Sequence, residues 1–163
     1  MMRKAALLAM FLLSGLLAWA APAQPGEPGN FGLGVMIGEP TGVAAKLWLG
    51  ATSAIDGVLA WSFARNPSIE IHADYLIHFF DLIRVEQGRL PLYLGIGASV
   101  SLGPELDFGA RFPLGGAYHF DSFPLDIFLE VGPIFLLVPG TSFDFSGGAG
   151  FRYYFPARGK AKK

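Results

Sequence analysis

Three residues with spacing suited to chemistry lie close together in the middle of this sequence. His72 and Asp74 are two positions apart, and His78 follows four residues later. In an extended strand this spacing puts all three on one face, where two imidazoles and a carboxylate could bind a metal ion. A hydrogen-bonded network inside a protein uses the same groups. We favour the network, and we predict no metal, no cofactor and no catalytic residue.

The residues around His72 alternate between two kinds of side chain. Ile69, Ile71, Ala73, Tyr75, Ile77 and Phe79 share one parity, and Ser68, Glu70, His72, Asp74 and His78 share the other. A period of two predicts a β-strand with two unlike faces. The same alternation recurs along the chain and predicts eight strands. They cover residues 31–38, 43–49, 55–63, 68–79, 90–101, 107–119, 125–137 and 143–155.

Composition excludes several classes of protein. Charged residues make up 15% of the chain and hydrophobic residues 52%, whereas soluble domains have about 25% charged residues. The net charge of −1 gives no electrostatic support for nucleic-acid binding. The chain has no cysteine, which excludes disulfides and thiolate chemistry.

The N-terminus carries the pattern of a cleaved signal peptide. Arg3 and Lys4 precede an apolar run over residues 5–19, and small residues follow at Ala18, Ala20, Ala21 and Ala23. A basic start, an apolar centre and a small-residue cleavage site are typical of secretion signals. We therefore predict a signal peptide at 1–23, a flexible leader at 24–30, one domain at 31–155 and a basic tail at 156–163.

The polar faces of the predicted strands consist mostly of Gly, Ala and Ser with a few charges. A face open to water would carry many long charged side chains, whereas the crowded interior of a small barrel needs small ones. The bulky apolar faces then point outward into lipid. The prediction is an all-β protein, a closed up-and-down antiparallel barrel of eight transmembrane strands, because closure leaves no backbone edge in lipid. The alternative is a soluble, lipocalin-like binding barrel with its apolar faces inside.

Five stretches carry a resemblance to known proteins: 32–42, 46–49, 72–76, 126–130 and 150–155. With them the chain resembles the small eight-stranded outer-membrane barrels, of which the OmpA transmembrane domain is the familiar example. It is most similar to a bacterial outer-membrane barrel family of unknown function. The resemblance implies a Gram-negative outer-membrane location and a barrel fold, and it supplies no substrate.

Ten side chains are predicted to form a charged interior. They are Lys46, Asp56, Glu70, His72, Asp74, Arg111, His119, Asp126, Glu130 and Arg152. Short turns suggest that Lys46, Asp56, Asp74 and Arg111 form one ionic plug. A turn at Pro139 to Ser142 would place Glu130 opposite Arg152.

The function predicted from these features is that of a small structural or surface-interaction barrel with a filled lumen. An open pore is not expected, because the interior of an eight-stranded barrel is just wide enough for side chains to fill it. The alternative function is a narrow gated conduit for small solutes. A lipid-modifying enzyme is less favoured, since the three histidines point inward and no His-x-Ser arrangement occurs. The expected partners are outer-membrane lipid and, through the strand at Phe143–Phe155, the barrel-insertion machinery. No nucleic acid is expected, and no surface partner can be named.

Overall fold

The computed structural model describes residues 30–62 and 68–155, with the backbone alone for Ser62. The predicted signal peptide, nearly all of the leader and the basic tail lie outside these residues, as does Phe63 at the end of one predicted strand. Within the described part of the chain, no helix has the length and apolar character needed to cross a membrane.

Nine antiparallel strands make up one sheet. Their alternating small and bulky residues suit a pleated surface that is crowded on one side only. The bounds are β1 Phe31–Glu39, β2 Thr41–Trp48, β3 Ser53–Ser62, β4 Ser68–Phe79, β5 Leu92–Leu102, β6 Leu106–Arg111, β7 Leu114–His119, β8 Leu125–Val138 and β9 Ser142–Phe155.

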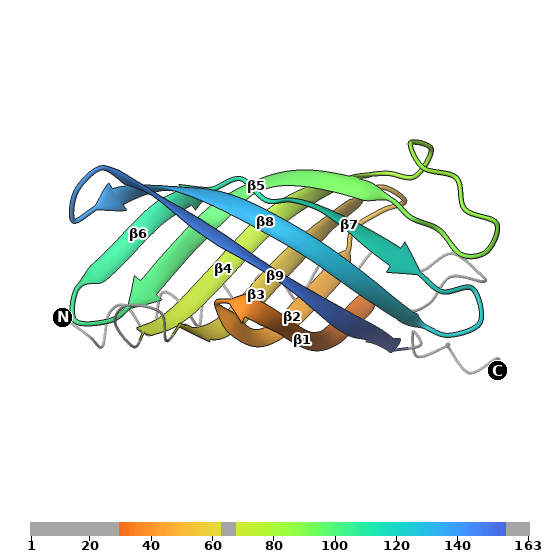
Figure 1. The fold of residues 1–163 in the computed structure, drawn as a ribbon, viewed down its shortest axis with the longest axis horizontal. Coiled ribbons are helices and arrows are strands. Elements are labelled where there is room, and N and C mark those ends of the chain that lie inside the picture. The colour runs from red at the N-terminus through yellow and green to blue at the C-terminus, as the bar shows by residue number, and fades with distance from the viewer. Residues whose placement is uncertain (1–29, 63–67, 156–163) are drawn as a thin grey trace, which may run out of the picture.

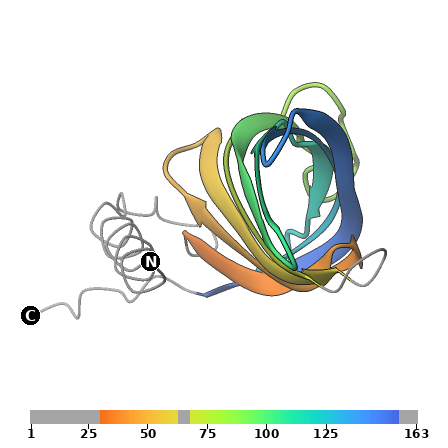
Figure 2. The same cartoon turned by 90° about the vertical axis from the view of Figure 1, so that its left-hand side faces the viewer.

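The strands follow one another around a ring (Figures 1 and 2). β1 pairs with β2 on one side and with β9 on the other, and β4 pairs with β5. β6 and β7 both lie between β5 and β8. Every strand therefore has a hydrogen-bonded neighbour on each side, which satisfies most of its backbone groups.

Where one strand was predicted over 107–119, the structure has two, so the sheet has nine strands rather than eight. Phe112 and Pro113 separate β6 from β7, because proline has no N–H to donate to the ladder. The backbone carbonyls of Pro113 and of Pro133 in β8 still accept hydrogen bonds. Phe112 N donates to Pro133 O at 2.9 Å, and Gly95 N donates to Pro113 O at 2.9 Å. Pro91 likewise delays β5, predicted from residue 90, to Leu92.

The two ends of the ring differ in their connections. We call the end with Phe31 and Phe155 the terminal end and the opposite one the turn end. The terminal end holds the turn at 49–52, the long connection at 80–91 and the turn at 120–124. The turn end holds Pro40 and the short turns at 103–105 and 139–141. The longest described connection thus lies at the same end of the ring as Phe31 and Phe155.

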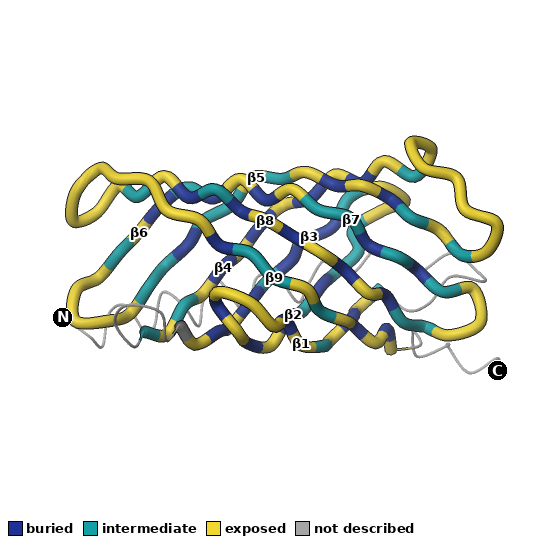
Figure 3. Tube along the Cα trace, viewed as in Figure 1, coloured by how far each residue is buried: buried dark blue, intermediate teal, exposed yellow. Residues whose placement is uncertain are grey.

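Buried and exposed residues alternate along the strands (Figure 3), and the exposed ones are mainly bulky and apolar while the buried ones include the charged side chains. Bulky apolar residues on every strand are exposed, including Leu129 at 66% and Phe145 at 63%. Arg111, Arg152 and Asp126 are 0% exposed. A soluble protein has the opposite arrangement, because burying a charge is costly and large apolar surfaces favour association.

Candidate functional site

The interior of the ring holds the predicted charged residues. Nine of the ten predicted side chains are buried, and Glu70 is half-buried. They come from seven of the nine strands, because alternate residues of each strand point inward. The charges gather mainly around two arginines, Arg111 on β6 and Arg152 on β9.

Arg111 bridges two carboxylates. Its Nη1 donates to Asp74 Oδ2 and its Nη2 donates to Glu130 Oε1 at 2.6 Å. Its Nε donates to Ser146 Oγ at 3.0 Å, and that hydroxyl donates to Gly132 O. All three guanidinium nitrogens are therefore bonded, which is the arrangement that the planar fork of arginine favours.

Arg152 is held less completely. Its Nη1 donates to Asp56 Oδ1, and its Nε lies 3.5 Å from Asp126 Oδ1 without forming a hydrogen bond. Its Nη2 has no hydrogen-bond partner among the described residues. The guanidinium carbon lies 3.8 Å from the centre of the Phe128 ring, so a cation–π contact takes the place of part of the missing hydrogen bonding.

Lys46 contacts a histidine and two aromatic rings. Its Nζ lies 2.7 Å from His78 Nε2, and His78 Nδ1 lies 3.2 Å from Thr52 O. A carbonyl only accepts, so Nδ1 carries the hydrogen and Nε2 accepts from the ammonium group. The ring centres of Trp48 and Tyr93 lie 5.0 and 4.9 Å from Nζ.

The metal-site interpretation finds no support in this geometry. His78 is bonded to Lys46 and Thr52, and Asp74 to Arg111. Within residues 30–62 and 68–155, no three His, Asp or Glu side chains could hold one metal ion. His72 Nε2 lies 3.4 Å from Glu70 Oε2, and neither nitrogen of His72 forms a hydrogen bond with the described residues.

Two predicted pairings have to be corrected. Arg111 reaches Asp74, as predicted, but Asp56 pairs with Arg152 and Lys46 with His78, so the four residues do not form one plug. Glu130 lies opposite Gly148 and Asp126 opposite Arg152, so the predicted pairing of Glu130 with Arg152 is wrong. The register shifts by four because the last hairpin turns about Pro139, two residues earlier than expected.

Comparison with known proteins gives one informative match. The N-terminal β-barrel domain of Pseudomonas aeruginosa OprF, a crystal structure, superposes with a TM-score of 0.62 at 13% identity. The match covers 79% of this chain and 100% of the OprF domain. This chain therefore shares the fold of that β-barrel domain. No protein-family model matches the chain, and neither does any curated protein.

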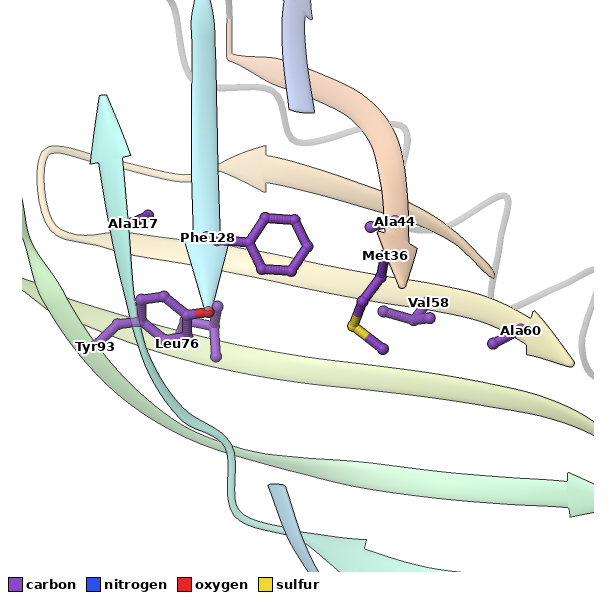
Figure 4. Packing of buried hydrophobic residues seen from close by; sticks show 8 residues of the cluster. All are labelled: Met36, Ala44, Val58, Ala60, Leu76, Tyr93, Ala117 and Phe128. Atoms are coloured by element: carbon purple, nitrogen blue, oxygen red, sulfur yellow. The ribbon is translucent and has the colours of Figure 1, made fainter. Parts of the chain in front are cut away.

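A cluster of apolar side chains is buried beside the charged residues. Met36, Ala44, Val58, Ala60, Leu76, Tyr93, Ala117 and Phe128 form one buried cluster, drawn in Figure 4. Phe128 also lies under the Arg152 guanidinium, and the Tyr93 hydroxyl donates to Glu130 Oε2 at 2.8 Å. The two arginine clusters and the apolar cluster are therefore in direct contact.

Three hydroxyl groups of this network were missed by sequence reasoning. Tyr93 donates to Glu130, Tyr154 donates to Asp126 Oδ2 at 2.6 Å, and Ser146 accepts from Arg111. All three lie at the alternate positions that form the polar face of their strands, and this placement was the signal in the sequence that could have found them. Attention to charge alone left them out, although a tyrosine on a face of small residues has to find a polar partner.

Proposed function

We propose that this chain is an integral protein of the bacterial outer membrane. Its signal peptide is cleaved, and its nine strands act as eight strand positions of a closed transmembrane barrel, with β6 and β7 forming one wall segment. Its role is structural, as a stable wall or a surface anchor, and it is neither an enzyme nor an open pore. The OprF barrel domain supports the location by analogy of fold.

The observation that carries this proposal is the inverted polarity of the barrel. Leucine, isoleucine and phenylalanine side chains cover the outside, while two arginines lie within ion-pair distance of four carboxylates in the interior. Lipid is the environment in which an apolar outer wall is stable. A ring of strands suits that environment, because paired backbone groups need no water.

A filled lumen favours a structural role over conduction. Arg111 spans from Asp74 on β4 to Glu130 on β8, and Arg152 joins β9 to Asp56 on β3. An ion crossing the barrel would have to displace these bonded groups. Each broken buried pair leaves an uncompensated charge, which costs about 3–5 kcal/mol.

Among the described residues, the turn end offers little surface for recognising a partner. Pro40 alone connects β1 to β2, and three residues each form the turns at 103–105 and 139–141. The partners we propose are therefore the lipid around the wall and, during assembly, the barrel-insertion machinery acting on β9.

Two measurements test this function. Cell fractionation and heat-modifiable migration on a gel should report a folded outer-membrane protein, and recovery as a soluble periplasmic monomer would refute the location. Planar-bilayer recording of the refolded full chain should give no conductance steps. Regular steps in the wild-type protein would support the gated conduit instead.

A further inference from the structure

Bulky apolar residues are exposed in the connections at the terminal end of the barrel, beyond the ends of the strands. Leu82 is 64% exposed, and Ile83 and Val85 are 38% and 37% exposed, all in the connection at 80–91 between β4 and β5. Phe123, in the turn between β7 and β8, is 67% exposed. Exposed apolar side chains that gather in one place, unlike single ones, mark contact with a partner or a membrane.

The described connections at the turn end have a different composition. Pro40, the turn at 103–105 and the turn at 139–141 consist of glycine, proline, glutamate and threonine. None of these described connections has a bulky apolar residue. The exposed apolar residues are therefore a property of the terminal end and not of every connection in this barrel.

Hydrogen bonds fix the connection at 80–91 to the neighbouring turn. Gly88 N donates to Asp121 Oδ2 at 2.7 Å, and the Tyr118 hydroxyl donates to Gln87 O at 2.8 Å. Gly88 has a φ of 71°, a left-handed conformation that glycine adopts at little cost. The two apolar segments therefore belong to one structural unit at the terminal end.

The connection at 80–91 also projects sideways from the barrel. Seen along the ring in Figure 2, it lies outside the outline formed by the strands, and Figure 1 places it at one end of the barrel. Phe79 and Leu92, where β4 ends and β5 begins, are exposed on the outer wall. The apolar surface of the wall thus continues into the connection, which lies over whatever surrounds the wall.

The charges of the connection do not oppose contact with lipid. Asp81 and Glu86 are matched in number by Arg84 and Arg89, so the segment has no net charge for an anionic lipid surface to repel. Apolar side chains beside charged ones suit the boundary between head groups and acyl chains. There the apolar groups are buried and the charged groups remain in contact with water.

We propose that the connection at 80–91 and Phe123 form a membrane anchor, which lies on the lipid leaflet at the terminal end of the barrel. Leu82, Ile83 and Val85 contact the upper part of the acyl chains beside β4 and β5, and Phe123 does so beside β7 and β8. The anchor fixes the depth of the barrel in this leaflet. The inference rests on the proposed outer-membrane location, and it names the lipid surface, not a protein, as the partner of these residues.

The test places one environment-sensitive fluorophore at a time in the full chain, which has no cysteine of its own. Leu82→Cys and Phe123→Cys carry it on the proposed anchor, and Glu86→Cys carries it at an exposed charged position of the same connection. Each labelled variant is refolded into vesicles of phosphatidylethanolamine and phosphatidylglycerol. The quenchers are lipids with a nitroxide near the head group and, separately, iodide on both sides of the membrane. A heat-modifiable band on a gel verifies that each variant is folded.

The labels at Leu82 and Phe123 should be quenched by the nitroxide lipids and protected from iodide, and the label at Glu86 should be quenched more strongly by iodide than either. Iodide quenching at Leu82 and Phe123 as strong as at Glu86 would overturn the proposal, because these residues would then face water and be free to bind a protein partner. Protection from both quenchers would also overturn it, since a second copy of the chain would then cover them.

A label at Leu129→Cys on the outer wall separates this inference from the proposed function. Nitroxide quenching at Leu129 together with iodide quenching at Leu82 would refute the anchor alone. Iodide quenching at Leu129 would refute the membrane barrel itself.

Discussion

Arg111 and Arg152 are both fully buried inside the same barrel, yet they are bonded differently. Arg111 uses Nε, Nη1 and Nη2 on three partners, whereas Arg152 forms one hydrogen bond and places the rest of its guanidinium over Phe128. Each arginine has two carboxylates nearby, so charge balance does not explain the difference. The geometry of the donors does: Arg111 locks β4, β6, β8 and β9 together, and Arg152 mainly joins β9 to β3.

The largest effect is expected when Arg111 is removed. Arg111→Ala leaves Asp74 and Glu130 buried without their cation and should lower the free energy of unfolding by about 3–5 kcal/mol. Urea unfolding in lipid bilayers, followed by tryptophan fluorescence, measures this change. Arg84→Ala, on the exposed connection, should stay within about 0.5 kcal/mol of the wild-type protein. An equal loss in Arg152→Ala would remove the distinction between the two arginines.

Replacement by lysine sharpens the comparison. Arg111→Lys keeps the charge but cannot serve Asp74, Glu130 and Ser146 at once, so it should cost about 2–3 kcal/mol. Arg152→Lys has only the Asp56 bond to preserve and should cost about 1 kcal/mol. The same unfolding assay measures both. If Arg152→Lys were the more damaging change, the bonding described here would not govern stability.

Much of this interior follows from the sequence because strand alternation fixes which side chains point inward. Short turns also fix neighbouring registers, so Asp56 lies opposite Lys46 and Asp74, and Arg111 lies opposite Gly97. The predicted register of the last hairpin was wrong by four residues. Because this shift is an even number, Glu130 and Arg152 stay inside the barrel but have different partners. Contacts across the lumen, such as Arg152 with Asp56, depend on how the ring closes, and no local pattern encodes that.

A third prediction concerns the space beside Arg111. A Cβ atom at Gly132 would lie 2.6 Å from Arg111 Nε and Nη2, so Gly132→Ala must push the guanidinium away from its partners. We expect a loss of about 1–3 kcal/mol, the usual cost of overpacking. Gly57→Ala is the control, because its Cβ would meet nothing closer than His72 O at 3.6 Å. A stable Gly132→Ala variant would mean that Arg111 has freedom to move.

The smallest expected difference is between the two buried tyrosines. Tyr93→Phe removes a donor from Glu130, which keeps its bond to Arg111, and should cost about 1 kcal/mol. Tyr154→Phe removes the hydroxyl group that donates to Asp126 Oδ2 at 2.6 Å. Asp126 then keeps only the Arg152 Nε atom, 3.5 Å from its Oδ1. This change should cost about 2–3 kcal/mol. The reverse order of the two losses would show that Arg152 holds Asp126 more tightly than the geometry indicates.

The most direct test of the account is the environment of the outer wall. The chain has no cysteine, so a single cysteine at Leu129 on the wall or Gly140 in a turn carries an environment-sensitive fluorophore at one known position. Both residues are exposed. In proteoliposomes the account predicts quenching of the Leu129 label by nitroxide-bearing acyl chains and of the Gly140 label by aqueous iodide. Quenching of the Leu129 label by iodide as strong as at Gly140 would contradict a wall in contact with lipid.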